Sequence, residues 1–568
     1  MDPRLHGASE ELPGARHSRR GLLNLTAWLA SAACALALTA ATAAPAAAPA
    51  ADQPQKGGQI IIGTWNEPTQ LNPVVATPAK EQRAMVASAI HDALWRLGPK
   101  GAIPNLAVEM PTVANRGISA DGLTYTVKLR RDAKWHDGTP FTAKDVVFSY
   151  QALINPNVKP ADVVGPAEME TMEAVDDFTV RWRMKRRYAP ILTALADFYI
   201  VPHHILSKSP DLNTDPYNNR PIGTGPFVFS EWVKGSHIIL QANKSYHGPG
   251  PYLDKLIFKS VPDLTVLFTQ LKTGEIDVVG YQGVIIDHYN EAKTLPNVKV
   301  FAESNPDMEI FGFSHLLPMF QDRKLRQALY YGINKKPIIN DVWLGLPLEA
   351  DTYISRTHWA YNPKVKDAYK YDPEKAKQLL EEAGWKLGSD GIRVKDGKRL
   401  SFNNSAATGN KAREKMQLIV QQQFRQIGVE MKIDNKAPAI MWADFYRKTQ
   451  FETYWGGQGR TVGPDPDYTI RLHSSQIPVK TGKGYNTMAY SNPEVDRLID
   501  AGVQEVDQDK RKVIYQQLQE LLVVELPHLP IYHSTYIDGI KATVQGFQPN
   551  PNAMAYGCWN PHEWWLRK

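Results

Sequence analysis

The chain has 568 residues, of which 22% are charged, and its net charge of +6 at pH 7 is small for that length. A charge of this size gives no strong electrostatic footprint for binding nucleic acid. The length exceeds what one hydrophobic core usually serves, so the sequence predicts two or three lobes.

The N-terminal segment has the parts of a secretory signal. Paired arginines lie in the segment Ser18-Arg19-Arg20-Gly21-Leu22-Leu23, and an apolar run extends from Leu22 to about Ala43. Small-residue cleavage sites are present at Ala41-Thr42-Ala43 and Ala48-Pro49-Ala50. This order predicts a removable signal over residues 1–44. The paired arginines resemble a twin-arginine signal, with an ordinary Sec signal as the alternative, and either route predicts export.

The two cysteines are Cys34 and Cys558. Cys34 lies within the apolar run, and Ser31 stands where a lipoprotein cleavage box would be expected to carry Leu, so we expect Cys34 to be removed with the signal. The remaining Cys558 then has no partner for an internal disulfide. After Pro54 no apolar run approaches the length needed to cross a bilayer.

The first half of the chain predicts short strands and helices in alternation. Period-two or continuous apolar patterns predict strands at 58–63, 125–129, 228–232, 237–242, 276–279 and 309–313. Helical spacing appears at 81–94, 143–153 and 264–271. Residues 180–187 alternate apolar and basic side chains, which favours a strand with one wet face over a site for a polyanion.

The second half predicts longer helices, at 325–333, 337–344, 411–427 and 510–526, with a strand at 429–433. The clearest helix starts at Asp372-Pro373-Glu374, where a capping carboxylate precedes proline at the first helical position. Gly384 ends that helix. The mixture of strands and helices in two differing halves predicts two α/β lobes.

One stretch is more specific than these patterns. Asp121-Gly122-Leu123-Thr124-Tyr125 is followed by Lys134-Trp135-His136-Asp137-Gly138-Thr139-Pro140-Phe141. The stretch resembles the signature of the family 5 extracellular solute-binding proteins, which include the oligopeptide, dipeptide and nickel receptors of ABC importers. Further family-like segments follow at 223–227, 272–278, 323–334, 371–376, 490–496 and 526–532. With them, the resemblance extends over nearly all of the mature chain.

The resemblance implies an α/β type 2 periplasmic-binding-protein fold, cluster C-like, with two main lobes, an extra subdomain and a two-strand hinge. We expect residues 57–305 plus 533–568 to form the first lobe with its inserted subdomain, and residues 306–532 to form the second. Such proteins trap a ligand by hinge closure, because a ligand that contacts both lobes favours the closed form.

The segment from Tyr454 to Asp467 departs from the family pattern. Peptide receptors of the family carry Gly-Trp, an Asp three residues after the Trp that pairs with the peptide ammonium, and a nearby Asp-Pro. Trp455 matches the Trp, and Asp465-Pro466 matches the mainly structural Asp-Pro. Position 458 is Gln, and an amide cannot neutralise an ammonium. Gly456-Gly457 predict an open face on Trp455, which would also suit a sugar.

The same mapping gives the remaining binding candidates. They lie on the loop after the first strand, on the loop before the helix at Lys411, in the 454–467 segment and before residue 489: Trp65, Asn66, Glu67, Asn404, Ser405, Asn410, Arg413, Gln458, Arg460, Tyr485 and Asn486. Arg413 and Arg460 could each hold a carboxylate or phosphate with a bidentate fork, and a solvated surface arginine is an equal alternative for each.

Catalysis and metal binding find little support. The sequence has no G-x-S-x-G, H-E-x-x-H or P-loop pattern, so we expect no enzyme. His203-His204 lie next to each other, and on a strand they would point opposite ways, so we expect no direct metal ligation. A metal–chelator complex stays open as a solute, and we expect no cofactor. His136-Asp137 belongs to turn chemistry, and Thr142 can cap the helix that begins at Ala143.

The sequence therefore predicts the periplasmic binding component of an ABC importer, which captures a peptide or peptide-like solute and delivers it to the membrane permease. An oligosaccharide, an opine-like compound or another amine-free conjugate is the alternative ligand. A chaperone-like holder of unfolded chains is the alternative from another class. We expect a monomer that binds no nucleic acid.

Overall fold

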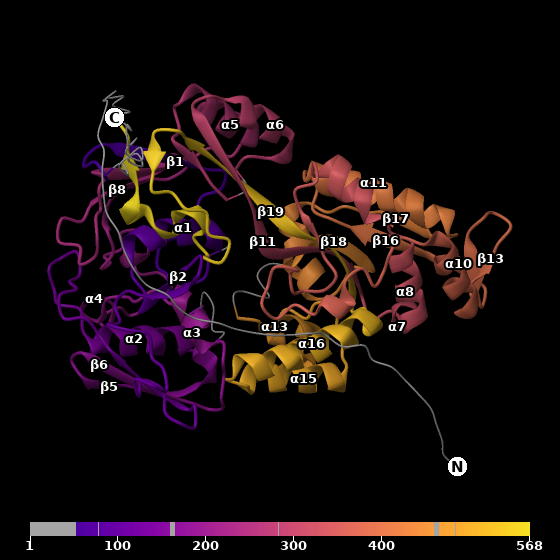
Figure 1. Ribbon diagram of the computed structural model, residues 1–568, viewed down its shortest axis with the longest axis horizontal. Helices are drawn as coiled ribbons and strands as arrows, with labels where there is room; N and C mark the ends of the chain where they lie inside the picture. Colours follow the sequence, from indigo (N-terminus) through magenta and orange to yellow (C-terminus); the bar gives the residue numbers. More distant parts are fainter. Residues whose placement is uncertain (1–52, 78, 160–164, 282, 459–464, 483) are drawn as a thin grey trace, which may run out of the picture. The chain divides into compact units, whose positions relative to one another are not determined.

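The computed structural model describes residues 53–77, 79–159, 165–281, 283–458, 465–482 and 484–568. The predicted signal at residues 1–44 therefore lies outside the described residues. Within them, the largest element is an 11-stranded sheet with two long antiparallel strands at its centre, β11 (Val298–Phe313) and β19 (His528–Lys541) (Figure 1). Both strands are far longer than the other described strands of this sheet, which have between two and seven residues.

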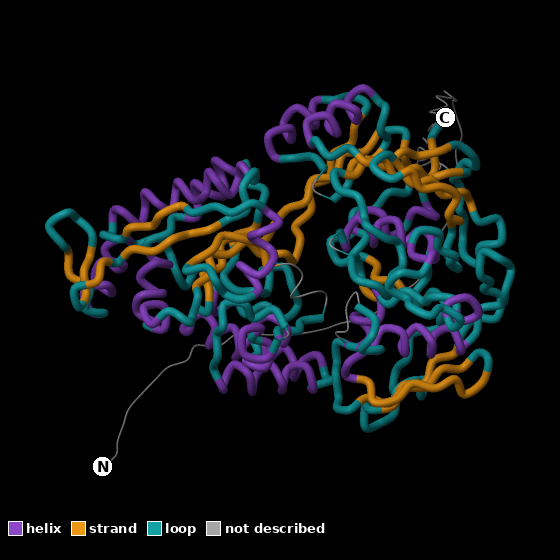
Figure 2. The backbone as a smooth tube through the Cα atoms, turned by 180° about the vertical axis from the view of Figure 1, so that it is seen from behind, coloured by secondary structure: helices purple, strands orange, loops and turns teal. Residues whose placement is uncertain are grey.

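The sheet continues from both sides of this central pair. Beyond β19 come, in order, β10 (Val278–Val279), β1 (Gln59–Thr64), β9 (Lys255–Ser260), β8 (His237–Ala242) and β7 (Phe227–Val233). Beyond β11 come β18 (Thr453–Gln458), β16 (Ser401–Ser405) and β17 (Glu430–Ile433), while β12 (Leu348–Glu349) pairs with β19. Figure 2 shows β11 and β19 as long orange strands that continue from one group of strands into the other.

Smaller sheets accompany the main one. A three-stranded sheet has the order β4 (Thr124–Lys128), β6 (Thr179–Met184) and β5 (Met169–Asp176). Others join β2 (Trp95–Gly98) to β3 (Gly101–Pro104), β13 (Lys386–Leu387) to β14 (Arg393–Lys395) and β15 (Lys398–Arg399), and β20 (Val544–Gln545) to β21 (Trp565–Leu566).

The longer helices are α1 (Lys80–Ile90), α2 (Ala143–Ile154), α5 (Leu264–Thr273), α6 (Ile286–Thr294), α8 (Arg323–Tyr331), α10 (Pro373–Glu382), α11 (Lys411–Gln426), α15 (Pro493–Gln504) and α16 (Gln508–Glu525). Short ones are α3 (Ile191–Ala194), α4 (His203–Leu206), α7 (Pro318–Gln321), α9 (Lys335–Pro337), α12 (Pro438–Ile440), α13 (Thr469–Leu472) and α14 (Pro478–Thr481). Among the described residues, none of these helices combines the length and the apolar character that a bilayer crossing requires.

Local capping chemistry confirms the predicted helix starts. The Asp372 side chain accepts a hydrogen bond from the backbone N–H of Lys375 at 2.8 Å, and Pro373 follows at the first helical position. Thr142 precedes α2, and its backbone N–H donates to the carboxylate of Asp145 at 2.8 Å. The basic stretch is also confirmed as a strand with one wet face, because Val180, Trp182 and Met184 are buried in β6 while the arginines between them are exposed.

One local prediction was wrong. His203 and His204 lie in the short helix α4 and not on a strand, and His204 Nε2 lies 2.7 Å from Asp137 Oδ2. The helix predicted at 337–344 is present with shifted bounds, because α9 (Lys335–Pro337) continues directly into the π-helical turn η4 (Ile338–Val342). Pro337 lies in the first turn of this segment, where a missing backbone N–H leaves no helical hydrogen bond unmade.

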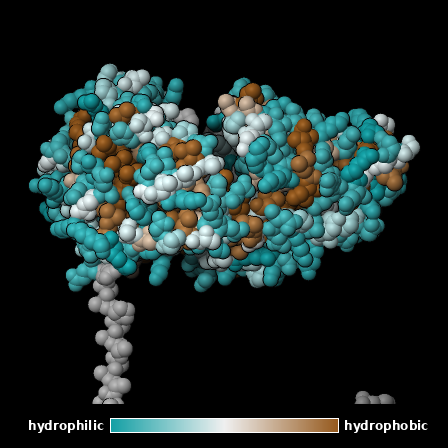
Figure 3. Space-filling view, turned by 90° about the horizontal axis from the view of Figure 1, so that it is seen from above, coloured by the Kyte–Doolittle hydropathy of each residue, from teal (hydrophilic) through white to brown (hydrophobic). Residues whose placement is uncertain are grey.

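Separate groups of buried apolar residues lie along the chain. One group surrounds the β4–β6–β5 sheet and α2, and two more pack on the two faces of the strands from β19 to β8. Two others are formed by residues between 308 and 532. The face in Figure 3 is mainly hydrophilic, with apolar side chains in small groups.

A set of contacts joins the end of β6 to the α13–α15 region. Arg186 Nη1 lies 2.9 Å from Asp500 Oδ1, and the hydroxyl of Tyr188 donates to Asp467 Oδ2 at 2.7 Å. The backbone N–H of Ala189 also donates to the carbonyl of Val503 at 2.7 Å. Two segments that lie about 300 residues apart in the sequence are therefore held together.

Candidate functional site

The loop after β1 uses its side chains to hold neighbouring segments. Trp65 Nε1 donates to the carbonyl of Tyr281 at 3.1 Å, just beyond β10. The Glu67 carboxylate accepts from Trp232 Nε1 at 2.5 Å and from the backbone N–H of Gly235 at 2.9 Å. Asn66 is exposed, and its side chain accepts from the Glu67 amide at 2.9 Å. Of these three candidates, Asn66 is the most exposed.

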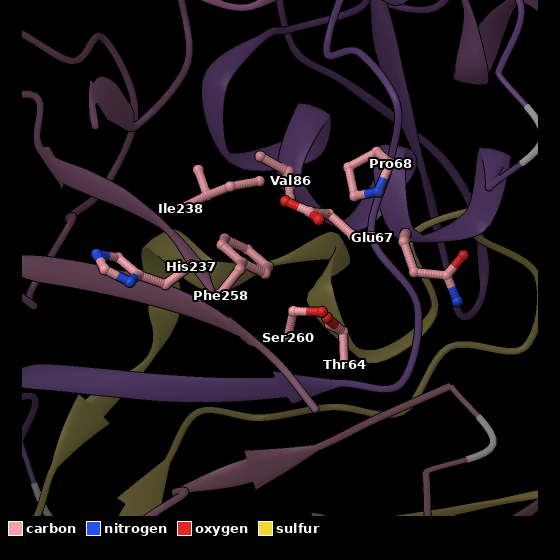
Figure 4. Close-up of a pocket in the computed structure, with 9 residues that line it drawn as sticks. Thr64, Glu67, Pro68, Val86, His237, Ile238, Phe258 and Ser260 are labelled. Atoms are coloured by element: carbon pink, nitrogen blue, oxygen red, sulfur yellow. The ribbon is translucent and has the colours of Figure 1, made fainter. Parts of the chain in front are cut away.

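A small pocket lies beside this loop, between α1 and strands β8 and β9 (Figure 4). Its empty space is about 260 Å³, part of it open to solvent, and it is lined by Thr64, Glu67, Pro68, Gln82, Val86, His237, Ile238, Phe258 and Ser260. Glu67 is the one predicted binding residue in this lining. Its carboxylate is already bonded to Trp232 and Gly235, so this pocket offers a solute no free carboxylate from Glu67.

The ring of Trp455 is not open, in contrast to the sequence expectation. Trp455 has no exposed surface, and its ring meets that of Phe311 at 89°, with centroids 5.9 Å apart. β18 is sandwiched between β16 and β11, so one face of its alternating side chains enters the core. The exposed aromatic residue here is Trp442, which is 38% exposed and lies beside Gly456.

Arg413 has a carboxylate partner from its own chain. Its Nε and Nη2 lie 2.6 Å and 3.0 Å from the two carboxylate oxygens of Glu309, which is buried. Burial alone would lower the pKa of Arg413, but the charge of Glu309 and its hydrogen bonds raise that pKa above the ordinary value. The guanidinium also lies 5.8 Å from the ring of Trp442. The predicted bidentate fork exists, but Glu309 occupies it.

Gly457 lies directly over this ion pair. A Cβ at this position would lie 3.5 Å from Arg413 Nη2 and 3.6 Å from Glu309 Oε2. Glycine therefore leaves the polar edge of the pair uncovered by any side chain from residue 457. Gln458 pairs with Met308 in the β18–β11 ladder, next to the same pair.

Asn404, Ser405 and Asn410 lie near this group but differ in burial. Asn404 is fully buried, donates to Thr453 Oγ1 at 3.0 Å and accepts from Gln417 Nε2 at 2.8 Å. Ser405 is buried in β16, next to Tyr454 of β18. Asn410 is exposed and caps α11 by accepting from the Arg413 backbone N–H at 3.0 Å. Asn404 and Asn410 thus already have structural partners.

The remaining candidates come from the segment around 460–490. Arg460 lies outside the described residues. Asp465 is an ion-pair partner of Arg511, with Oδ1 and Nη2 2.7 Å apart, and burial raises its pKa to about 6 although Arg511 acts in the opposite direction. Asn486 is fully buried and donates to the carbonyls of Leu472 and Tyr490. Asp465 and Asn486 therefore hold this segment together.

Tyr485 differs from its neighbours because it is 39% exposed. The guanidinium carbons of Arg447 and Arg471 lie 5.1 Å and 5.2 Å from its ring centroid. Both distances are within the range of cation–π attraction. The family resemblance identified the tyrosine but neither arginine.

Sequence reasoning missed three groups of residues. Glu309 was not expected as the partner of Arg413, and Trp442 was not expected as the exposed ring beside Gly456. The third group is a cluster of tyrosines at the end of β10, in β19 and in the turn η8 (Tyr556–Trp559): Tyr281, Tyr536 and Tyr556. In the described part of the chain, no group of three or more His, Cys, Asp or Glu side chains is placed to hold a metal ion.

Solved structures define the class to which this fold belongs. Over 91% of this chain and 100% of the other, the fold is similar to that of the oligopeptide-binding protein AppA from Bacillus subtilis in complex with a nonapeptide, with 29% identity and a TM-score of 0.77. NikZ from Campylobacter jejuni, in complex with Ni(L-His), matches over 89% of this chain and 99% of its own, with 29% identity and a TM-score of 0.78. The fold is the mixed α/β type 2 periplasmic-binding fold.

Sequence comparison then identifies the family. Residues 102–478 match the model described as bacterial extracellular solute-binding proteins, family 5 Middle. The oligopeptide-binding protein AppA of Bacillus subtilis (strain 168) is 30% identical over 530 residues, which cover 91% of this chain and 93% of AppA. The chain belongs to family 5 of the bacterial extracellular solute-binding proteins, as its motifs at 121–125 and 134–141 led us to expect.

Proposed function

We propose that this protein is the substrate-binding component of an ABC importer and captures a peptide or peptide-like solute. The observation that carries the proposal is its membership of family 5, together with its similarity to oligopeptide-binding AppA over nearly the whole chain. The fold, similar to that of AppA with a bound nonapeptide, supports the same ligand class. We infer that the predicted signal at residues 1–44 directs export to the periplasm, where the protein acts as a monomer and delivers its solute to the membrane permease.

Capture proceeds by hinge closure between two lobes, residues 57–305 plus 533–568 and residues 306–532. The separate apolar cores support this division, since each draws most of its members from one side of it. The register of β11 against β19 shifts between Ser304 and Met308, where Pro306 has no backbone N–H for the ladder. An interrupted ladder at the crossing point gives the strands a place to bend.

The solute lies between the loop after β1 and the end of β18. On the second lobe, the exposed ring of Trp442 and the uncovered edge of the Glu309–Arg413 pair offer an apolar surface beside a polar one. Peptides present alternating apolar side chains and polar backbone groups, which suit such a surface. The protein acts by binding and catalyses no reaction.

Native mass spectrometry of the protein purified from its own host tests the proposal. The expected result is a bound mass that dissociates on denaturation and fragments as a peptide. A released glycoside or opine-like compound would replace peptide with the alternative ligand class. Stable complexes with unfolded chains, and no small ligand, would replace the importer role with a chaperone-like one.

A further inference from the structure

Three tyrosines from distant parts of the chain meet beneath the loop after β1. Tyr281 follows β10, Tyr536 lies in β19 and Tyr556 begins η8. The ring centroids are 4.5 Å apart for Tyr281 and Tyr556, 5.1 Å for Tyr536 and Tyr556, and 5.6 Å for Tyr281 and Tyr536. Tyr281 is half-buried, so the cluster reaches the surface at that ring. Trp65, a predicted ligand residue, donates to the Tyr281 carbonyl.

A carboxylate lies behind these rings. Asp538 is two residues after Tyr536 in β19, so the two side chains share one face of the strand. Asp538 is only 6% exposed, and its Oδ1 has no hydrogen-bond partner within the residues that the structure describes. A backbone hydrogen bond from Tyr281 acts on the carboxylate, but burial dominates and raises the pKa of Asp538 to about 7.

The other charges around the cluster are also negative. The carboxylates of Glu81 and Asp307 act on Tyr281, and the Tyr536 hydroxyl donates to Asp307. Glu303 acts on Asp538 from the neighbouring strand. Among the described residues, no lysine or arginine forms an ion pair with Asp538. A buried carboxylate oxygen without a partner is costly, so it favours a site for a group that supplies the missing donor.

We propose that Tyr281, Tyr536, Tyr556 and Asp538 form a cation subsite that holds the ammonium group of the captured solute. The negative faces of the tyrosine rings attract a cation, and an ammonium supplies the charge-assisted donor that Asp538 Oδ1 lacks. The subsite neutralises the ammonium of the solute, which Gln458 cannot do because an amide carries no charge. This inference rests on the proposed function, and it places the amine of the solute on the first lobe.

Methylammonium chloride is the first probe, since it carries an ammonium and little else. With protein stripped of solute at pH 8, we expect 100 mM methylammonium to raise the melting temperature by about 1–2 °C above the value in NaCl of equal ionic strength. Asp538→Asn, which keeps the shape of the side chain, should abolish that difference. Glu231→Gln is the matched control, because it removes an exposed carboxylate from β7, which contributes no residue to the cluster, and it should keep the full shift.

A second variant covers the case in which Asp538→Asn does not fold. Gly280→Ala would place a methyl group 3.6 Å from Asp538 Oδ1, at a position whose φ is not in the left-handed region. It should fold and should also lose the methylammonium shift. An equal shift in wild type, Asp538→Asn and Gly280→Ala would overturn the subsite.

A nonapeptide library and its N-acetylated counterpart form the second arm, measured by native mass spectrometry. Acetylation should weaken binding to wild type at least about tenfold and binding to Asp538→Asn less than about threefold. Equal binding of both libraries to wild type would overturn the ammonium subsite and leave peptide capture standing. Binding of neither library would instead overturn peptide capture, and the methylammonium arm would then decide the subsite alone.

Discussion

The two tryptophans beside Gly456 differ in burial, and we therefore expect them to have different roles. Trp455 is fully buried against Phe311, whereas Trp442 is 38% exposed beside the Arg413 guanidinium. A buried aromatic ring stabilises the fold through its packing. An exposed ring next to a buried charge pair is suited to binding a partner, because aromatic anchors dominate many interfaces.

Alanine at the two positions should therefore separate stability from binding. Trp455→Ala should lower the free energy of unfolding by about 3–5 kcal/mol, because it leaves a cavity in the core. Trp442→Ala should leave the melting temperature almost unchanged and weaken binding of the co-purified solute by about 1–3 kcal/mol. Differential scanning calorimetry and isothermal titration calorimetry measure the two quantities. Unchanged affinity in Trp442→Ala would remove this residue from the site.

Asp538 also predicts a pH dependence of stability. Its pKa is about 7 in the folded protein and about 4 in an unfolded chain, so the folded state binds more protons between these values. Stability contributed by this group is complete below pH 4 and is lost as the pH rises to 7. The groups that face it are Glu303, Cys558 and the backbone of Tyr281.

The wild-type protein should therefore lose stability relative to Asp538→Asn across this window. The melting temperature of the variant minus that of wild type should rise from pH 4 to pH 7 and level off above pH 7. Other titrating groups, including Asp465, are common to both proteins and cancel in the difference. A difference that stays flat would show that Asp538 titrates at the same pH in the folded and unfolded states.

At the scale of elements, the end of β6 and the α13–α15 region form a contact that lobe opening would break. Arg186 pairs with both Glu168 and Asp500, and Tyr188 donates to Asp467. Tyr188 is buried, so its hydrogen bond to a carboxylate is shielded from water. These contacts stabilise the arrangement in which the two segments meet.

The double variant Arg186→Ala/Tyr188→Phe should shift the solute-free protein towards an open form. We expect the contact to contribute about 1–2 kcal/mol, enough to change a population by roughly tenfold. Small-angle X-ray scattering should show a larger radius of gyration than in wild type. Arg183→Ala is the control, because Arg183 pairs with exposed Glu170 on the same sheet. Identical scattering from all three proteins would contradict the prediction.

Some elements follow from local sequence, whereas contacts between distant segments do not. The start of α10 follows from Asp372-Pro373, and the wet face of β6 follows from its alternation, because both depend on neighbours within a few residues. The Glu309–Arg413 pair joins residues 104 positions apart, and no local pattern connects them. Likewise, local sequence could not show that Trp455 is buried and Trp442 exposed, because their burial depends on which strands flank β18.

At the scale of the whole molecule, the family motifs predicted the fold because they are spread along the chain from residue 121 to residue 532. They predicted less about the solute, because a binding site is a small set of side chains on a shared scaffold. The tyrosine cluster illustrates this limit. Its members come from residues 281, 536 and 556, and they meet only because β10, β19 and η8 converge beside α1.

Cys558 is buried in the turn η8, so the reactivity of its thiol reports how often the protein opens locally at this turn. It is the chain's one cysteine beyond residue 34, and its carbonyl accepts from Ser88 Oγ of α1 at 2.8 Å. A thiol reagent can react only when η8 separates from α1, so the labelling rate measures how often this happens. Bound solute that engages Tyr556 should slow the labelling of the native protein, while leaving the urea-unfolded protein equally reactive. Solute-independent labelling would mean that η8 opens without disturbing the captured molecule.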